Sequence, residues 1–313
     1  MKLRARISLV LLLLTPLASA EPKPKPAEIR IVFLGDIIPH AKVQRRVFAD
    51  DVRIHADIKP HLDAADFVVA NLETPVAQGL AIDGKIRQDP AHFDGEVYTD
   101  FPRFNAHPKL LAELKLLGID LLGVANNHAL DRGELGLEMT LDAIKKAGMY
   151  HAGHTAHSPL HIQKINGANF AFYACVFRNL YPSRPEPRGI EICTDLGLQR
   201  ASKAAKTHDA ALIVFPHWGA ENTEKPTYEQ RKFAKKALEV ATAVVGHHPH
   251  VVQPSETKDG RHLTYSLGNF ISNQQRSAQK NGLVLTLLFA PDPNGPPGLL
   301  RASYQGTRAT PGL

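Results

Sequence analysis

Short apolar runs rich in β-branched and aromatic residues alternate with helical patterns along the 313-residue chain, and this alternation restricts the folds open to it. Nine runs have the length and composition of strands: residues 29–34, 67–70, 121–125, 170–177, 211–216, 242–245, 262–266, 283–289 and 299–304. Three segments have the pattern of helices: residues 108–117, 136–147 and 227–240. Interleaved strands and helices predict an α/β layered domain, and the last strands, which have no helices between them, indicate a second sheet packed on the first.

Most of the predicted strands are followed by a polar side chain at the carboxyl end. The residues that follow are oxygen and nitrogen donors: Asp36, Glu73, Asn127, His217, His248 and His250. α/β proteins bind their ligands at the carboxyl ends of parallel strands. Carboxylates, amides and imidazoles are the donors that divalent Mn, Fe, Zn, Mg or Ca accept. The pattern therefore predicts a site for one or two divalent cations, in which a bridging carboxylate would offset part of the repulsion between two cations.

The densest group of these donors is the run Gly246-His247-His248-Pro249-His250, which follows the apolar segment 241–245. Pro249 bars continuation as a helix, so the imidazoles are expected at a strand end. In an extended segment His248 and His250 point to the same side, which makes His247 the less favoured ligand. The alternative is a chance cluster or a solvated loop in a chain that holds 16 histidines.

The first 20 residues are predicted to be a signal peptide. Lys2, Arg4 and Arg6 form a positive start, residues 7–14 an apolar stretch, and residues 18–20 a small-residue cleavage site. Cleavage near Ala20 would leave a periplasmic or secreted protein. The alternative, an uncleaved anchor, is disfavoured because the apolar stretch is far shorter than the roughly 20 residues that span a bilayer. Residues 21–28 read as an extended Pro/Lys linker, and residues 29–313 as a single domain.

Charge argues against a nucleic-acid partner, and the two cysteines raise the question of a disulfide. Removing the three cations of the leader lowers the formal charge from +6 to +3, so the basic isoelectric point does not indicate a nucleic-acid partner. In an oxidising compartment Cys175 and Cys193 either form a disulfide or remain free thiols.

Two long loops are predicted, at residues 78–104 and 181–189, and either is placed to cover a site.

Seven sequence elements, in this order, resemble the CapA/PgsA capsule-synthesis family, bacterial proteins linked to poly-γ-glutamate production. They are Gly35-Asp36, Asn71-Leu-Glu73, Ala125-Asn-Asn-His-Ala-Leu-Asp131, Ala152-Gly153, His217-Trp-Gly-Ala-Glu221, Gly246-His-His-Pro-His250 and Tyr265-Ser-Leu-Gly-Asn-Phe270. The resemblance extends from about residue 29 to about residue 274. That family is similar to the calcineurin-like metallophosphoesterases, which implies a four-layer α-β-β-α sandwich with a dinuclear metal site at the strand ends.

The resemblance also implies roles for individual residues. It makes Asp36 a carboxylate ligand, Glu73 the bridging carboxylate and Asn127 an amide ligand. The imidazole ligands would be His217, His248 and His250. Each residue has a structural alternative, such as a turn cap for Asp36 or a packed histidine beside the single Trp for His217.

Three further residues are predicted to act on the substrate. The resemblance implies that His128 is a general acid or a hydrogen-bond donor to the transition state. Asp131, three residues on, would polarise its ring. Glu221 would be a general base or a partner of a ligand; its alternative is a carboxylate in a polar loop. Asn269 and Tyr265 are expected near the mouth of the site, where they would otherwise satisfy only backbone groups.

The sequence departs from the two-metal phosphoesterase pattern at two places. Ile38 stands where those enzymes have a histidine, and His40 lies two residues further on. One metal position is therefore weakened, lost, or served by His40. Ala129 replaces the acidic residue that often follows the Asn-His pair, so Asp131 would have to serve as the acidic partner of His128.

Together these features predict a divalent-metal-dependent hydrolase or transferase that acts on an anionic envelope polymer such as poly-γ-glutamate. The first alternative is a non-catalytic export or binding component that works with a membrane polymer synthetase. A periplasmic phosphomonoesterase is the weaker alternative. The residues by themselves do not name the substrate, which follows from the resemblance.

Overall fold

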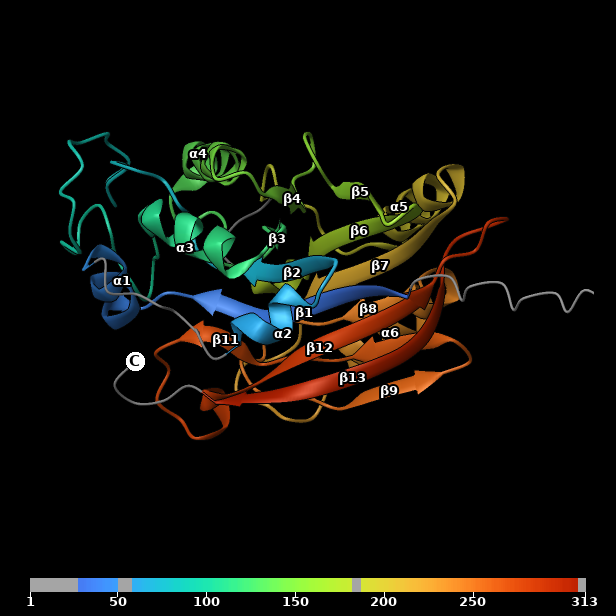
Figure 1. Cartoon of the computed structure of the whole chain (residues 1–313). Helices are drawn as coiled ribbons and strands as arrows, with labels where there is room; N and C mark the ends of the chain where they lie inside the picture. Colours follow the sequence, from blue (N-terminus) through green and yellow to red (C-terminus); the bar gives the residue numbers. More distant parts are fainter. Residues whose placement is uncertain (1–27, 50–57, 182–186, 309–313) are drawn as a thin grey trace, which may run out of the picture.

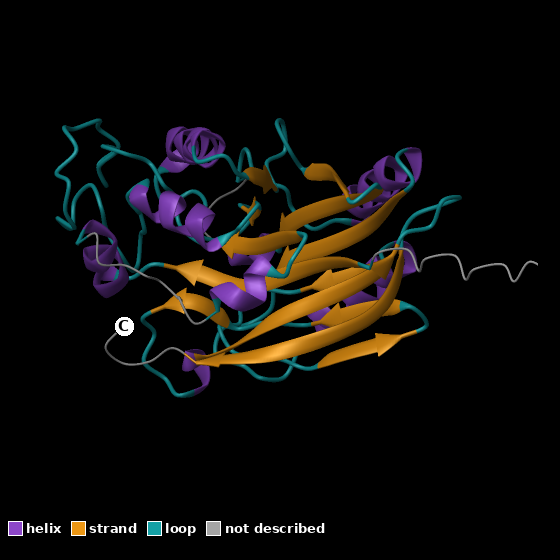
Figure 2. Ribbon diagram, in the orientation of Figure 1, coloured by secondary structure: helices purple, strands orange, loops and turns teal. Residues whose placement is uncertain are grey.

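The computed structural model describes residues 28–49, 58–181 and 187–308, and it consists of two packed β-sheets with helices outside them (Figures 1 and 2). The predicted signal peptide and most of the predicted linker lie outside the described residues. The four-layer α/β sandwich expected from the sequence is confirmed. No described helix is both long enough and apolar enough to cross a bilayer.

The first sheet has seven strands, in the order β13-β12-β1-β2-β3-β4, and β11 pairs with the end of β1. Its strands are β1 (Ile29–Ile38), β2 (Phe67–Leu72), β3 (Leu121–Gly123), β4 (Tyr150–Ala152), β11 (Asn269–Ser272), β12 (Asn281–Ala290) and β13 (Gly298–Arg308). β1 to β4 and β11 are parallel, whereas β12 runs antiparallel to β1 and β13 antiparallel to β12.

The second sheet has six strands, in the order β5-β6-β7-β8-β10-β9. Its strands are β5 (Leu160–Ile165), β6 (Ala168–Val176), β7 (Ala210–His217), β8 (Ala243–Val245), β9 (Ser255–Lys258) and β10 (Arg261–Thr264). The four central strands are parallel, and antiparallel β5 and β9 form the two edges.

Six α-helices and two short 3₁₀ turns complete the described part of the chain. The helices are α1 (Ala41–Phe48), α2 (Lys59–Asp63), α3 (Lys109–Leu117), α4 (Gly133–Lys146), α5 (Asp195–Thr207) and α6 (Tyr228–Val240). The 3₁₀ turns are η1 (Arg178–Leu180) and η2 (Ala278–Lys280). A capping box starts α6, because Thr227 and Gln230 exchange side-chain to backbone hydrogen bonds.

The core lies between the sheets and is rich in aromatic rings. The ring centroid of Phe33 on β1 lies 6.4 Å from that of Phe172 on β6 and 6.3 Å from that of Phe215 on β7. Gly123 on β3 allows the sheets to approach, since a Cβ there would lie 2.5 Å from the ring of Phe215. Removal of one such buried ring typically costs about 3–5 kcal/mol, so this layer holds the two sets of strand ends in register.

The expectation that the late strands form a second sheet is right for β10, which lies in the second sheet, and wrong for β12 and β13. β12 and β13 extend the first sheet beside β1, and the second sheet is built mainly from the middle of the chain. Antiparallel pairing with β1 needs no helical crossover, so the lack of intervening helices reflects this hairpin rather than a separate sheet. Helix α5 is not among the helices expected from the sequence, because its buried face consists of small residues together with Leu198.

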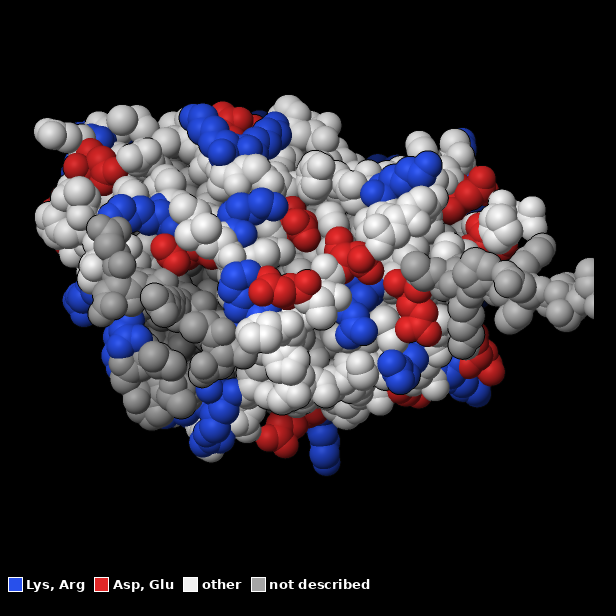
Figure 3. Space-filling view, viewed as in Figure 1, with Lys and Arg blue, Asp and Glu red and all other residues white. Residues whose placement is uncertain are grey.

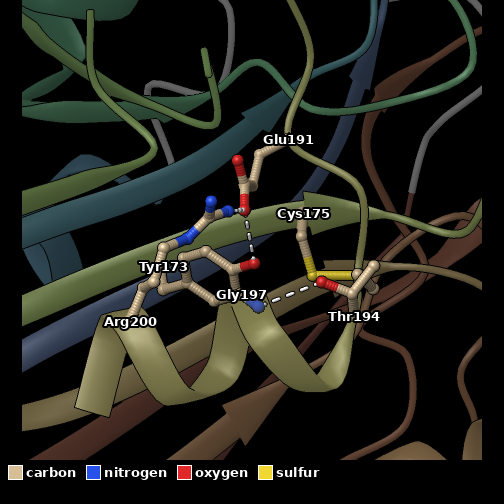
Figure 4. Close-up of a disulfide and its surroundings, with 7 residues drawn as sticks. Tyr173, Cys175, Glu191, Thr194, Gly197 and Arg200 are labelled. Carbon is tan, nitrogen blue, oxygen red and sulfur yellow. Dashed lines mark hydrogen bonds and ion pairs between the residues drawn. A yellow bond between two sulfur atoms is a disulfide. The ribbon is translucent and has the colours of Figure 1, made fainter. Parts of the chain in front are cut away.

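A disulfide joins Cys175 near the end of β6 to Cys193, just before α5 (Figure 4). On the same side of β6, Glu191 accepts hydrogen bonds from the hydroxyl of Tyr173 (2.9 Å) and the guanidinium of Arg200 (2.8 Å). The bond closes a loop with a sequence separation of 18 residues and ties the start of α5 to the sheet.

We expect replacement of both cysteines, C175S with C193S, to lower the free energy of unfolding by about 3 kcal/mol, the chain-entropy value for a loop of this length. Denaturant unfolding of the oxidised wild type and the double variant measures the difference. Wild type treated with a reductant should match the variant. An unchanged midpoint in both would contradict the stabilising role.

The buried histidine of β10 makes stability depend on pH. His262 Nδ1 lies 2.8 Å from the hydroxyl of Thr257, and Nε2 lies 2.8 Å and 3.0 Å from those of Thr264 and Tyr304. Burial lowers the pKa of His262 from 6.5 to about 4. Between these values the unfolded chain binds the extra proton, so stability is complete above pH 6.5 and falls as the pH drops toward 4.

We therefore predict that His262 alone accounts for a loss of about 2 kcal/mol between pH 7 and pH 5. Unfolding free energies of wild type and His262→Gln at both pH values test this. The variant should show a pH dependence that is weaker by this amount. Parallel pH curves for the two proteins would show that the histidine does not carry the effect.

Candidate metal centre

The predicted site residues meet where the carboxyl ends of strands from both sheets converge. β1 and β2 supply Asp36 and Asn71, and Glu73 follows β2 directly. β7 ends in His217, and residues 247–250 follow β8. All of these side chains except that of Pro249 are polar, and all of them are buried.

Glu73 lies at the centre of the cluster. Its Oε1 atom is 3.5 Å from Nε2 of His217 and 3.6 Å from Nε2 of His250. It belongs to two groups whose possible ligand atoms all lie within 4.8 Å of one another. One group consists of Asp36, Glu73 and His217, and the other of Glu73, His248 and His250. The position of Glu73 is therefore that of a carboxylate shared between two ligand sets.

The environment of Glu73 fits a cation. Both carboxylate oxygens are buried and accept no hydrogen bond from the described residues. Burial raises the pKa of Glu73 to about 8. With metal–ligand bonds of about 2.0–2.2 Å, neighbouring ligands on one ion lie roughly 3–3.5 Å apart. The distances from Glu73 to His217 and His250 are of this size, so a divalent ion would satisfy an otherwise costly buried group.

Asp36 is the most fully engaged acidic residue of the cluster. Oδ1 accepts a hydrogen bond from Asn71 (2.8 Å) and lies 3.2 Å from Nδ1 of His247. Oδ2 accepts from the backbone N–H of His248 (3.1 Å) and lies 3.3 Å from Nδ1 of His250. Burial opposes ionisation, but the bonds to His247 and His250 hold the pKa of Asp36 well below its usual range. Asp36 is therefore ionised at neutral pH.

The imidazoles divide into two kinds. Burial holds the pKa values of His217 and His248 well below the usual range, so both rings are neutral and offer lone pairs. For His250 burial also disfavours the charge, but the carboxylates of Glu73 and Asp36 outweigh it and raise the pKa to about 9. A bound cation would replace this proton as the partner of Glu73.

The expectation of an extended His248-x-His250 segment is wrong. His248 and His250 have φ values of 97° and 57°, in the left-handed region. A Cβ on Gly246 would lie 2.1 Å from the carbonyl oxygen of Tyr265, so only glycine fits where the chain enters this tight turn. The turn brings His247 onto Asp36 as well, so all three histidines of the run reach the cluster.

Amide side chains connect the ligands. Asn127 Oδ1 lies 2.7 Å from Nε2 of His217, which brings Asn127 into the cluster. Three amides that the sequence pattern does not single out as ligands, or places only at the mouth, also contribute: Asn71, Asn126 and Asn269. Asn71 lies between Asp36 and His217, Asn126 donates to Asn71 and to the carbonyl of Leu72, and Asn269 Oδ1 lies 3.0 Å from His250 Nδ1. Asn71 could have been identified from the sequence, because it is a polar residue within the apolar run of β2.

His128 and Asp131 form a pair beside the cluster. His128 Nδ1 lies 2.8 Å from Asp131 Oδ2, which also accepts a hydrogen bond from the backbone N–H of Phe104 (2.7 Å). The Phe104 ring meets the His128 ring edge-on, with centroids 4.7 Å apart. Burial works against the charged form of His128, but the bond to Asp131 outweighs it and raises the pKa.

His40 and Glu221 are not part of the buried cluster. Nδ1 of His40 lies 3.0 Å from the carbonyl of Ile38 and 3.3 Å from the backbone nitrogen of Asn273, and neither ligand group among the described residues includes His40. Ile38 is buried and offers no ligand atom. Glu221 is exposed in the loop after β7, and no hydrogen bond or ion pair links its carboxylate to the described cluster. The structure therefore does not support a direct contact between Glu221 and the ligands.

Another group of possible ligands, Glu138, His154 and His157, lies outside this site. Glu138 is half-exposed and pairs with Nε2 of His154 (3.2 Å) and of His157 (3.5 Å). The carboxylate of Glu138 is reached by solvent, whereas that of Glu73 is fully buried and accepts no hydrogen bond from a described residue. The Glu73 cluster is for this reason the stronger candidate for a metal centre.

Known proteins resemble this chain in sequence and in fold. PGA biosynthesis protein CapA of Bacillus subtilis is 29% identical over 254 residues, which cover 77% of this chain and 63% of the relative. Capsule biosynthesis protein CapA of Bacillus anthracis is 29% identical over 272 residues, which cover 82% of this chain and 63% of the relative. The chain thus matches about 63% of the length of each of these relatives.

Two solved structures share the fold at low sequence identity. A phosphatase from Mycoplasma pneumoniae superposes with a TM-score of 0.54 at 15% identity, covering 90% of this chain and 94% of the other. A 5′-nucleotidase precursor from Thermus thermophilus superposes with a TM-score of 0.51 at 13% identity, covering 90% of this chain and 54% of the other. The family model described as bacterial capsule synthesis protein PGA_cap matches residues 30–274, and the chain belongs to this family.

Proposed function

We propose that the protein is a divalent-metal-dependent hydrolase or transferase that acts on an anionic polymer of the cell envelope during capsule synthesis. The observation that carries the proposal is the buried carboxylate of Glu73, which accepts no hydrogen bond from a described residue and lies among the imidazoles of His217, His248 and His250. The names of the CapA relatives, which refer to PGA and capsule biosynthesis, support the choice of polymer.

The residues that would hold the metal are Asp36, Glu73, Asn127, His217, His248 and His250. His247, which contacts Asp36, joins this set as a further candidate. The oxygen and nitrogen donors suit Mn, Fe, Zn or Mg. When bound, such an ion acts as a Lewis acid that lowers the pKa of water and polarises the oxygen of the group under attack.

His128 and Asp131 would manage the proton. Asp131 accepts the hydrogen bond from Nδ1 of His128, fixes the ring and favours its protonated form. Asp131 is itself held by the backbone N–H of Phe104. A protonated His128 would donate to the leaving group or to the charge that develops on the substrate.

The location in the periplasm or outside the cell is also a proposal. The charged start, apolar stretch and small-residue site within residues 1–20 support export. The disulfide between Cys175 and Cys193 supports an oxidising compartment, since such bonds are rare in the cytosol.

A non-catalytic role in polymer export, alongside a membrane synthetase, is the second candidate. Ile38 favours it, because a buried aliphatic side chain replaces a ligand of the two-metal phosphoesterases and reduces the donors on the β1 side. In that case the cluster would bind metal for stability alone. Metal content and turnover of an acidic polymer separate the two candidates.

Replacement of Glu73 tests the metal centre. We expect Glu73→Gln to weaken binding of Mn or Zn by on the order of a hundredfold, because the shared carboxylate is lost. Burial raises the pKa of Glu73, so folding works against its ionisation above the usual carboxyl range, and the metal-free variant should be more stable than the metal-free wild type at pH 7.

Calorimetric titration and thermal unfolding, with metal and with a chelator, measure both effects. Glu221→Gln is the matched control, because this residue is exposed and acts on the cluster only through the field of its charge, so it should change both values far less than Glu73→Gln does. Equal metal loss in the two variants would show that Glu73 is not the shared ligand.

Replacement of Asp131 tests the proton donor. Removal of its charge lowers the pKa of His128, so Asp131→Asn should move the alkaline limb of the pH–rate profile to lower pH, while His128→Gln should reduce the rate roughly 10²–10⁴-fold. Initial rates on poly-γ-glutamate and on a chromogenic phosphodiester, measured from acidic to alkaline pH, provide the profiles. An alkaline limb that stays in place would contradict the assignment of His128 as the acid.

A further inference from the structure

Helices α5 and α6 form the outer layer of the second sheet, away from the core that joins the two sheets. α5 packs on the sheet through Leu198, Ala201 and Ala205, and α6 packs through Phe233 and Ala237. Each helix connects two parallel neighbouring strands, so each runs antiparallel to them and begins at the edge of the sheet where the metal cluster lies. The exposed sides of both helices therefore extend from the end of the sheet that holds the site to the opposite end.

These two helices concentrate positive charge. Their cations are Arg200, Lys203, Lys206, Arg231, Lys232, Lys235 and Lys236. Their acidic residues are Asp195, Glu229 and Glu239. Seven cations against three acids give +4 in 26 residues, whereas the other 287 residues of the chain hold 30 cations and 28 acids. On the face seen in Figure 3, by contrast, basic and acidic side chains are interspersed.

Part of this charge has no partner within the described protein. Lys236 pairs with Asp195, and Arg200 pairs with Glu191. No ion pair joins Lys203, Lys206, Lys232 or Lys235 to a described residue, and all four side chains lie on the outer sides of the helices. Clustered like charges repel one another and do not stabilise the fold, so this surface suits an anionic partner.

A groove of about 610 Å³ opens on this surface between the second half of α5 and the end of α6. Its lining consists of Gln199, Ser202, Lys203, Lys206, Thr207 and Val240. The lining holds two ammonium groups, two hydroxyls and one amide, and none of these residues is acidic. The ammonium groups suit carboxylates, while the hydroxyls and the amide can hydrogen-bond a neutral main chain between the charges.

We propose that the exposed surface of α5 and α6 binds a linear acidic polymer, with the groove at Lys203 and Lys206 as its anchoring point. The unpaired lysines occur along both helices, and a 13-residue helix is about 20 Å long. This distribution matches a chain of repeated negative charges better than a single small anion. Lysines rather than arginines predominate, which indicates attraction by charge density rather than by the bidentate geometry of one group.

A membrane surface is the less favoured partner. The large exposed apolar residues of this layer are Leu196, Tyr228 and Val240. They occupy the ends of the helices rather than a continuous stripe, and an interfacial helix needs a broad apolar face.

Binding at this surface is independent of the metal centre. The polymer would be guided to the site only if the proposed function holds.

A charge-reversal pair tests the proposal with a matched control. Lys203→Glu with Lys206→Glu should weaken binding of fluorescent poly-L-glutamate roughly thirtyfold at low salt, if each lysine contributes as at an anionic surface. Lys145→Glu with Lys146→Glu changes the net charge equally in the last turn of α4, outside this surface, and should stay within about twofold of wild type. Fluorescence anisotropy at two salt concentrations measures affinity, and melting temperature checks the fold.

The outcomes separate the possible explanations. Equal weakening in both charge-reversal pairs, or no polymer binding by the wild type, would overturn the proposal. Binding to anionic vesicles with none to the polymer would also overturn it and assign the surface to a membrane. Polymer binding should survive chelation and Glu73→Gln. Binding that is retained while turnover is lost would support a polymer site separate from the metal cluster. Polymer binding that requires metal would place the ligand at the Glu73 cluster instead.

Discussion

The buried carboxylate of Glu73 is the group on which the organisation of the site depends. It faces imidazole nitrogens of His217 and His250 at 3.5 Å and 3.6 Å, and neither of its oxygens accepts a hydrogen bond from a described residue. Buried polar atoms are almost always paired in folded proteins. A group that departs from this rule, surrounded by potential ligands, fits a cation site and is a more specific signal than the count of histidines.

This arrangement depends on how the two sheets are built. Parallel strands place all their carboxyl ends at one edge, and the aromatic layer around Phe33 holds the two edges together. Asp36 comes from the first sheet and His217 from the second, and Asn71 contacts both. The packing energy of the core therefore sets the positions of ligands that are far apart in sequence.

Much of this could be predicted from strand patterns, because a polar residue after an apolar run lies at a strand end whatever the rest of the fold. The positions of Asp36, Glu73 and His217 follow from that rule. The conformation of residues 247–250 could not be predicted, since no strand pattern marks the left-handed backbone at His248 and His250 or the close approach of Gly246 to Tyr265. Strand patterns also do not give the partner of β12, which is set by tertiary contacts.

The loop of residues 78–104 shows how an irregular segment can still position a reactive side chain. The buried guanidinium of Arg132 donates to the carbonyl oxygens of Leu80 and Val97 and to the hydroxyl of Thr99. A buried cation that is satisfied by several carbonyl dipoles fixes all of them at once. Because Arg132 directly follows Asp131, the same anchor sets the carboxylate that holds His128. The buried charge of Arg132 therefore connects the 78–104 loop to the segment that carries the proposed proton donor.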